Sequence, residues 1–448
     1  MPTRRIVLVD LCWTRDKDPR LPLGHASLLA ALRREPELDT RSVVLPVNAG
    51  PTGADEVAIA ILAEARGAAP EDADVAIGAY AWNEALLQST LPLLRERGFR
   101  GRIILGGPQI SYAGAGVERI YPDVDVFVRG YGEEALCALA RDPANLAIAG
   151  VHRAGRPDRG EQAEVRLEAL PSPWLDGLIP IAAAPFIRWE TKRGCPFRCS
   201  FCQHREPGAR LLRRSLSASR ITREIDRFCD AGVSEIAVLD PIFNLGPDAT
   251  AVLQRFADRS YRGRLSLQCR AEYVDEAFLG AAGALDTCLE FGLQTIHERE
   301  GEAVLRRNHI GRVDDALAGV RRRHIDHEVS LIFGLPEQTL ASFQESVAWC
   351  LARRVPTIKA FPLLLLRGTA LERDRDRWGF VDAGGAMPIA VESSSFSRAD
   401  WQAMARISEA LRLSEGKHPA TMGELLERAG ERHPDLARWQ PMSASEGA

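Results

Sequence analysis

The chain has 448 residues and a formal net charge of −4, with 57 Lys and Arg against 61 Asp and Glu. This near-balance gives no electrostatic attraction for nucleic acid or an anionic membrane, and "MPTRRIVLVD" at the N-terminus lacks the apolar stretch of a signal peptide. We therefore expect a cytoplasmic protein of two or three domains that binds neither nucleic acid nor membrane.

Residues 1–150 alternate short apolar runs with longer amphipathic ones. The apolar runs predict buried parallel strands, since both faces of such strands are covered. They span 5–10, 41–47, 73–80, 102–107 and 125–130. Helical patterns separate most of them, so we predict an α/β fold that begins with a Rossmann-like, doubly wound sheet. Ligands of such sheets bind beyond the carboxyl ends of the strands.

Residues 151–185 are rich in proline towards their end, "LEALPSPWLDGLIPIAAAP", which is typical of a linker. A second alternation then begins, with predicted strands at 186–193, 235–240, 264–271, 286–294, 328–336 and 357–366. Six strand–helix units are two fewer than a closed eight-fold barrel has. We therefore predict a partial (β/α)6 barrel over 186–375 and a short helical region over 376–448.

The segment "ETKRGCPFRCSFCQH" places Cys195, Cys199 and Cys202 just after the first barrel strand. Structural zinc needs four ligands. His204 would complete the number, but it is only two residues from Cys202, which makes it awkward for both side chains to reach one zinc ion. A disulfide is excluded by the odd number and by the reducing compartment. Three thiolates can hold an iron–sulfur cluster with one open iron, which binds a substrate or cofactor. Structural zinc and inert thiols remain the alternatives.

This C-x-x-x-C-x-x-C motif, with Phe201 before its last cysteine, resembles the signature of the radical S-adenosylmethionine (SAM) superfamily, whose fold is a partial barrel. The resemblance implies a [4Fe–4S] cluster on the three cysteines and SAM on the open iron. It also implies an electron donor such as flavodoxin or ferredoxin. One electron from the cluster would cleave SAM and give a 5′-deoxyadenosyl radical.

Two later segments, "LEFGLQT" (289–295) and "SLIFGLPEQT" (330–339), resemble strands that contact SAM in that superfamily. "LDPIFNLG" (239–246) departs from the superfamily's Gly-Gly-Glu motif, which leaves the methionine amine to Asp240 or to nearby carbonyls. Arg270 is a candidate partner for the methionine carboxylate. Taken singly, each residue also fits a structural role. The implied cofactor contacts are Phe201, Asp240, Gln268, Arg270, Glu290, Gln294 and Gly334.

The sheet ahead of the barrel resembles the cobalamin-binding subclass of the superfamily, over about residues 5–375. The segments "AYAWNE", "GGPQISY" and "RGYGEE" carry this resemblance. No histidine follows an aspartate at the spacing of the usual cobalt-ligand motif, and this subclass binds cobalamin without one. A sheet that recognises substrate or a partner is the alternative. The implied contacts are Tyr80, Trp82, Asn83, Gly106, Gly107, Pro108, Gln109, Tyr112, Gly130, Tyr131 and Glu133.

Together these resemblances imply a cobalamin-dependent radical SAM methyltransferase that acts on a carbon of a small-molecule or natural-product substrate. The alternatives are a radical enzyme for cyclisation, rearrangement or oxidation, one whose sheet no longer binds cobalamin, and a non-catalytic iron–sulfur or zinc scaffold. The sequence does not identify the substrate, the oligomeric state or the lower cobalt ligand.

Overall fold

A computed structural model describes residues 4–50, 52–181, 185–204, 214–246, 248–385 and 387–432. The chain forms two compact units. One runs from the N-terminus to Phe186 and also takes in Ser215–Arg227, and the other holds the rest of the described chain from Ile187 onward. Within the described ranges, no helix combines the length and apolarity needed to cross a membrane.

A six-stranded sheet forms the centre of the first unit. Its strands are β1 (Arg4–Cys12), β2 (Leu38–Pro46), β3 (Ala73–Gly78), β4 (Arg102–Gly106), β5 (Val126–Val128) and β6 (Val151–Arg153). They lie in the order β2-β1-β3-β4-β5-β6, and only β6 is antiparallel to its neighbour. The five predicted strands are thus confirmed, together with the doubly wound sheet.

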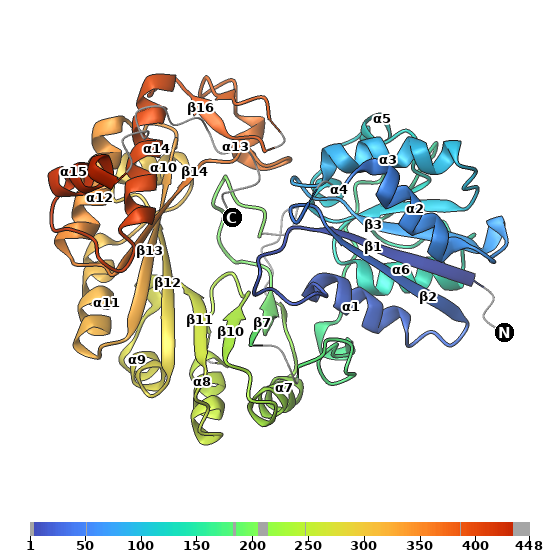
Figure 1. Ribbon diagram of the computed structural model, residues 1–448, viewed down its shortest axis with the longest axis horizontal. Coiled ribbons are helices and arrows are strands. Elements are labelled where there is room, and N and C mark those ends of the chain that lie inside the picture. Colours follow the sequence, from blue (N-terminus) through green and yellow to red (C-terminus); the bar gives the residue numbers. More distant parts are fainter. Residues whose placement is uncertain are drawn as a thin grey trace. The chain divides into compact units, whose positions relative to one another are not determined.

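Helices cover both faces of this sheet (Figure 1). They are α1 (Leu23–Leu32), α2 (Ala54–Ala65), α3 (Glu84–Glu96), α4 (Pro108–Ser111), α5 (Val117–Ile120) and α6 (Gly132–Arg141). Val7 and Val9 of β1 enter the core beneath α2 and α3, whereas Ile6 and Leu8 enter the core beneath α1 and α6. Because both faces are buried, β1 is apolar at nearly every position.

The strand order reverses its direction of growth between β1 and β3. In doubly wound sheets such a switch point is where ligands bind, because the flanking loops leave on opposite faces. Here Trp82 Nε1 and Asn83 Nδ2, in the loop after β3, both donate to the carbonyl of Leu11, at 3.2 and 3.1 Å. The loop after β3 is therefore tied to the end of β1.

The second unit contains the other six-stranded sheet, in the order β14-β13-β12-β11-β10-β7. Its strands are β7 (Phe186–Trp189), β10 (Glu235–Val238), β11 (Arg264–Cys269), β12 (Asp286–Gln294), β13 (Asp326–Phe333) and β14 (Thr357–Pro362). The pairs from β10 to β14 are parallel. All six predicted strands form, so the partial barrel is confirmed.

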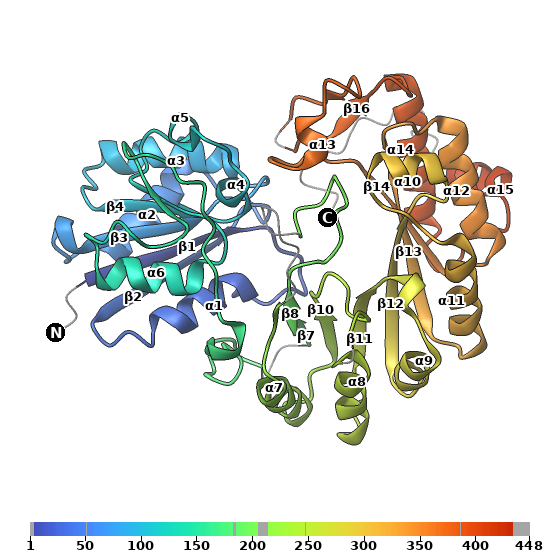
Figure 2. The ribbon, with the colours of Figure 1, turned by 180° about the vertical axis from the view of Figure 1, so that it is seen from behind.

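Helices lie along the outside of the barrel sheet (Figure 2). These helices are α8 (Asp248–Asp258), α9 (Glu276–Gly283), α10 (Glu298–Ala303), α11 (Ile310–Arg322), α12 (Leu340–Ala352) and α13 (Ala370–Arg373). The preceding α7 (Ala218–Asp230) falls mostly within the first unit. The C-terminal region adds α14 (Arg398–Leu413) and α15 (Met422–Arg432). It also contains a short antiparallel pair, β15 (Val381–Asp382) and β16 (Ala390–Glu392), which the sequence analysis did not predict.

Candidate functional site

The barrel strands bury one face more deeply than the other. On β11, Leu265 and Leu267 are fully buried, whereas Gln268 is half-buried. Gln268 pairs in register with Glu290 of β12, which is also half-buried. Glu290 in turn pairs with Glu328 of β13. The less buried face of the barrel thus carries a row of polar side chains, and two of the predicted cofactor contacts belong to it.

The three cysteines lie in the loop that follows β8 (Lys192–Arg193). None of them forms a disulfide; Cys199 is buried, and Cys195 and Cys202 are half-buried. The backbone of Ser200 fixes the middle of this loop, because its N–H donates to the carbonyl of Val304 at 2.9 Å and its carbonyl accepts from the N–H of Leu371 at 2.9 Å. Residues about 100 and 170 positions away thus hold the cysteine loop in place.

Burial governs the protonation of the thiols. It raises the pKa of Cys202 to about 11, and the neighbouring thiols Cys199 and Cys195 add to this rise. Burial likewise raises the pKa of Cys195. These two groups are therefore neutral thiols at pH 7 without a bound metal, and metal binding would release their protons.

The donor set fits an iron–sulfur cluster better than a single ion. In the described part of the chain, no group of three or more His, Cys, Asp or Glu side chains is placed to hold one metal ion. Each thiolate of an iron–sulfur cluster binds a different iron atom, so the three sulfurs need not converge on one point. The side chain of His204 is exposed. The zinc alternative therefore has no structural support among these residues.

Arg306 is a site residue that the sequence analysis missed. Its side chain is buried, and Nη1 lies 3.9 Å from Cys199 Sγ, within the range of an N–H···S hydrogen bond. Nη2 donates to the carbonyl of Gly292, whereas the buried Nε has no partner. An unsatisfied buried donor beside free thiols fits a site that takes up further acceptor atoms. Nothing in the sequence distinguishes Arg306 from Arg307.

Arg270 reaches the cysteine loop, as its guanidinium lies 4.2 Å from the ring centre of Phe197. Its charge is paired, because Nη2 lies 3.2 Å from an oxygen of Glu272, and the same nitrogen donates to the carbonyl of Arg307 at 3.1 Å. Phe201 is half-buried in the same loop. The loop and Arg270 are thus brought together, and the assignment of Arg270 to a methionine carboxylate stays a prediction.

Asp240 supports the segment that leads into the cysteine loop. Its fully buried carboxylate accepts from the backbone N–H groups of Thr191 and Lys192, at 2.7 and 3.1 Å, and from the Thr191 hydroxyl. Lys192 Nζ donates to the carbonyls of Phe243 and Leu245, at 2.7 and 3.1 Å. Burial raises the pKa of the Asp240 carboxyl. Contact of Asp240 with the methionine amine stays a prediction.

The end of β12 contains a bulge between Gly292 and Gln294, and Gln294 has a positive φ of 70°. The Gln294 amide nevertheless occupies the space beside Gly292, where an added Cβ would come within 2.8 Å of Nε2. Gly292 shares its strand face with Glu290, two residues earlier. The Gln294 amide thus lies on the Glu290 face, although the bulge interrupts the regular alternation of the strand.

Gly334 has a φ of 88°, which favours glycine whether or not a ligand approaches. Its N–H and that of Leu335 donate to Gln338 Oε1, at 2.7 and 3.2 Å. Gln338 Nε2 donates to Glu300 Oε2 at 3.2 Å, and the same oxygen accepts from the Thr295 hydroxyl at 2.5 Å. Gln338 and Glu300, which the sequence analysis also missed, link the loops after β13 and β12.

The predicted cobalamin contacts follow β3, β4 and β5, whose carboxyl ends lie side by side in the first sheet. The rings of Tyr80 and Trp82 stack with centres 4.4 Å apart, and the Trp82 side chain is 38% exposed. Asn83 is fully buried; its amide oxygen accepts from the Tyr80 N–H at 2.9 Å, and its amide nitrogen donates to Gly78 and Leu11 carbonyls. Trp82 is accessible to a ligand, whereas Asn83 shapes the loop.

At two of the predicted glycines, neighbouring backbone lies so close that it leaves no room for a side chain. Gly107 has a φ of 90°, and a Cβ there would lie 2.8 Å from the carbonyl oxygen of Ala79. Gly130 has a φ of 80°, and its Cβ would lie 2.5 Å from the carbonyl oxygen of Ala163. Gly106 has no such contact. Among the remaining predicted contacts, Gln109 and Glu133 are buried, and Pro108, Tyr112 and Tyr131 are half-buried.

Asp10 is a residue of this sheet edge that the sequence analysis missed. It lies near the carboxyl end of β1 and is 8% exposed. Burial raises its pKa to about 6. Burial also raises the pKa of Tyr80, and the charges of Asp10 and Glu133 add to that rise. The signal was available, since an aspartate that follows "RIVLV" interrupts an otherwise apolar strand.

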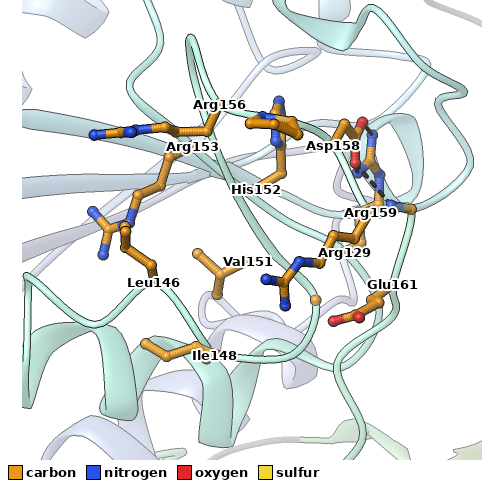
Figure 3. Close-up of a pocket in the computed structure, with 13 residues that line it drawn as sticks. Arg129, Leu146, Ile148, Val151, His152, Arg153, Arg156, Asp158, Arg159 and Glu161 are labelled. Atoms are coloured by element: carbon orange, nitrogen blue, oxygen red, sulfur yellow. Dashed lines mark hydrogen bonds and ion pairs between the residues drawn. The ribbon is translucent and has the colours of Figure 1, made fainter.

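No predicted site residue lines the pocket in the first unit that Figure 3 shows, although Gly130 directly follows Arg129 of its lining. It is lined by residues between Arg129 and Glu161, among them Leu146 and Val151. Arg129 donates to both carboxylate oxygens of Asp158, at 2.6 and 2.8 Å. The buried Arg129 therefore already has a counter-charge, and the pocket shows no group committed to chemistry.

A family model described as the radical SAM superfamily matches residues 189–350. The cobalamin-dependent radical SAM methyltransferase TokK of Streptomyces tokunonensis is 28% identical over 308 residues, which is 61% of this chain and 44% of TokK. The 2-(S-pantetheinyl)-carbapenam-3-carboxylate methyltransferase of Streptantibioticus cattleyicolor is 31% identical over 208 residues, 42% of this chain and 30% of that protein. The chain thus matches less than half the length of either relative.

Two solved structures share the fold over most of the chain. TsrM of Kitasatospora setae, a radical SAM methyltransferase with cobalamin and a [4Fe-4S] cluster bound, gives a TM-score of 0.67 at 19% identity, covering 89% of this chain and 84% of TsrM. The cobalamin-dependent SAM radical enzyme OxsB gives a TM-score of 0.69 at 16% identity, covering 92% of this chain and 67% of OxsB. At such identities the likeness concerns the fold alone.

Proposed function

We propose that the chain is a cobalamin-dependent radical SAM enzyme and a methyltransferase that acts on a carbon of a small natural-product intermediate. The observation that carries this proposal is the trio of free thiols, held in one loop of the matched domain beside the unsatisfied Nε of Arg306. The named activities of the two curated relatives support methyl transfer as the reaction type.

The chain's own residues would divide the work between the two units. Cys195, Cys199 and Cys202 would hold a [4Fe–4S] cluster, and the polar barrel face that includes Gln268 and Glu290 would orient SAM. When bound, the cluster supplies the electron that cleaves SAM, and cobalamin carries the methyl group.

In the first unit, the accessible Trp82 would pack against cobalamin. The buried strands beneath it give this loop a rigid base. The cluster also needs an electron donor, for which we propose a flavodoxin or ferredoxin. The substrate class rests on the relatives alone, one of which acts on a carbapenam carboxylate.

Anaerobic reconstitution with iron, sulfide and hydroxocobalamin tests this function. We expect iron–sulfur and corrinoid absorption together, and transfer of label from methyl-labelled SAM to the corrinoid fraction after reduction with dithionite. A variant with Cys195, Cys199 and Cys202 all replaced by alanine should contain no cluster iron but should still bind cobalamin. Zinc in place of iron would contradict the proposal, and so would a wild-type protein that binds iron but no corrinoid.

A further inference from the structure

Two arginines follow α10, and their surroundings differ. The side chain of Arg307 is 80% exposed and lies 3.4 Å from a carboxylate oxygen of Glu302. The Arg306 residue is only 9% exposed, and no carboxylate forms an ion pair with it among the described residues. The Glu272 carboxylate, which is paired with Arg270, acts on the Arg306 charge only from beyond ion-pair distance. A buried guanidinium with no carboxylate at ion-pair distance is costly, because its charge has lost the solvation of water. Such a group persists where something else compensates its charge.

The neighbours of Arg306 identify what that compensation is. Its Nη1 reaches Cys199 Sγ at 3.9 Å, in the loop that also carries Cys195 and Cys202. Its Nη2 is fastened to the carbonyl of Gly292 at the β12 bulge, so the side chain cannot swing away. The unpaired Nε remains available as a further donor in the same buried space.

We propose that Arg306 is a positioning residue for the iron–sulfur cluster, which it serves by hydrogen-bonding Cys199 and by setting a fixed positive charge beside the cluster. This inference rests on the proposed function. Three thiolates on a [4Fe–4S]²⁺ core give a net charge of about −1, and one added electron brings it to about −2. In a buried site the second negative charge raises the electrostatic free energy, and a nearby guanidinium offsets part of that rise. Arg306 therefore makes the cluster easier to reduce.

The backbone holds Arg306 firmly enough for this role. Its N–H donates to the carbonyl of Gly301 at 2.7 Å, and a Cβ on Gly301 would lie 2.6 Å from the carbonyl oxygen of Arg306. The preceding Leu305 has a positive φ of 54°. This tight turn after α10 directs two successive arginines to different environments, one buried at the thiols and one exposed.

The test is a potentiometric titration of the reconstituted cluster, followed by the electron paramagnetic resonance signal of its one-electron reduced form, with dithionite as the reductant. We expect Arg306→Gln to lower the ratio of reduced to oxidised cluster at least tenfold at a fixed potential, which corresponds to a midpoint about 59 mV more negative. Arg306→Lys, which keeps the charge, should lie between Arg306→Gln and the wild type. Arg307→Gln is the matched control and should titrate like the wild type.

The outcomes separate this inference from the proposed function. A wild-type protein that assembles no cluster would contradict the proposed function. If the wild type assembles the cluster and Arg306→Gln titrates at the same midpoint with full iron content, only the role of Arg306 is wrong. If Arg306→Gln melts like Arg307→Gln but retains no iron, the positioning role is supported directly. If Arg306→Gln does not fold, Arg306→Lys is compared with Arg307→Gln instead. Full iron content with less than a tenfold loss of reduced cluster in Arg306→Lys supports the role of the charge. A loss of tenfold or more in Arg306→Lys overturns it.

Discussion

Gln338 and Glu300 are joined by a buried hydrogen bond of 3.2 Å, which connects the loop after β13 with the helix that follows β12. Both side chains are almost completely buried, at 0% and 2% exposed. The same glutamine accepts from two backbone N–H groups, at Gly334 and Leu335. One side chain thus fixes the carboxyl ends of two neighbouring barrel strands, which are the ends expected to border SAM.

Replacing Gln338 by alanine should destabilise the barrel by about 1–3 kcal/mol, because it leaves the N–H groups of Gly334 and Leu335 and the carboxylate of Glu300 without that partner. The measurement is urea denaturation. Gln254→Ala removes an exposed glutamine from α8 and is the matched control. Equal midpoints for the two variants would contradict the bracing role of Gln338.

Asp240→Asn should reduce cluster iron even though no metal ligand changes. In Asp240, Oδ1 accepts from the N–H groups of Thr191 and Lys192, and Oδ2 accepts from the Thr191 hydroxyl. The asparagine keeps the shape but replaces one of these two acceptors by an N–H₂ donor, which then faces a group that donated to the carboxylate. We expect a loss of about 1–3 kcal/mol of stability together with lower iron content per chain after reconstitution. Asp315→Asn, an exposed position on α11, is the control. Full iron content in Asp240→Asn would show that this carboxylate does not support the cysteine loop.

Asp10 should make stability depend on pH. Its pKa of about 6 in the folded chain is above its ordinary value of 3.8, so the folded state holds the proton more tightly than the unfolded state. Stability is therefore lost as pH rises from about 4 to 6, and a deficit of about 3 kcal/mol remains above that window. Asp10→Asn should be more stable than the wild type at pH 7.5 but show little advantage at pH 4. Urea unfolding at both values measures this, and a pH-independent difference would rule out Asp10 as its source.

Trp82→Ala should weaken binding of hydroxocobalamin without unfolding the first sheet. The exposed indole stacks on Tyr80 and donates to the Leu11 carbonyl, so its removal takes away apolar contact area at the switch point while the buried Asn83 still holds the loop. We expect at least a tenfold rise in the dissociation constant, with Trp82→Phe between it and the wild type. Unchanged corrinoid binding by Trp82→Ala would place the ligand elsewhere.

The periodic and local features of this protein were predictable from the sequence. Both sheets and all eleven predicted strands follow from apolar runs, because a strand buried on both faces must be apolar throughout. The three cysteines were predictable as one group, since they share a single loop. Asp10 was predictable in principle and was overlooked, although an acidic side chain near the end of a buried strand is conspicuous.

The sequence by itself determined the two α/β units and the three cysteine ligands, since both depend on residues that are close together in the chain. Only the tertiary structure decided which groups support that set. Arg306 and Arg307 are identical neighbours, yet one turn buries the first at Cys199 and exposes the second. Ser200 is likewise held by Val304 and Leu371, far along the chain. These assignments depend on long-range contacts between segments, and such contacts have no signature in the local pattern of residues.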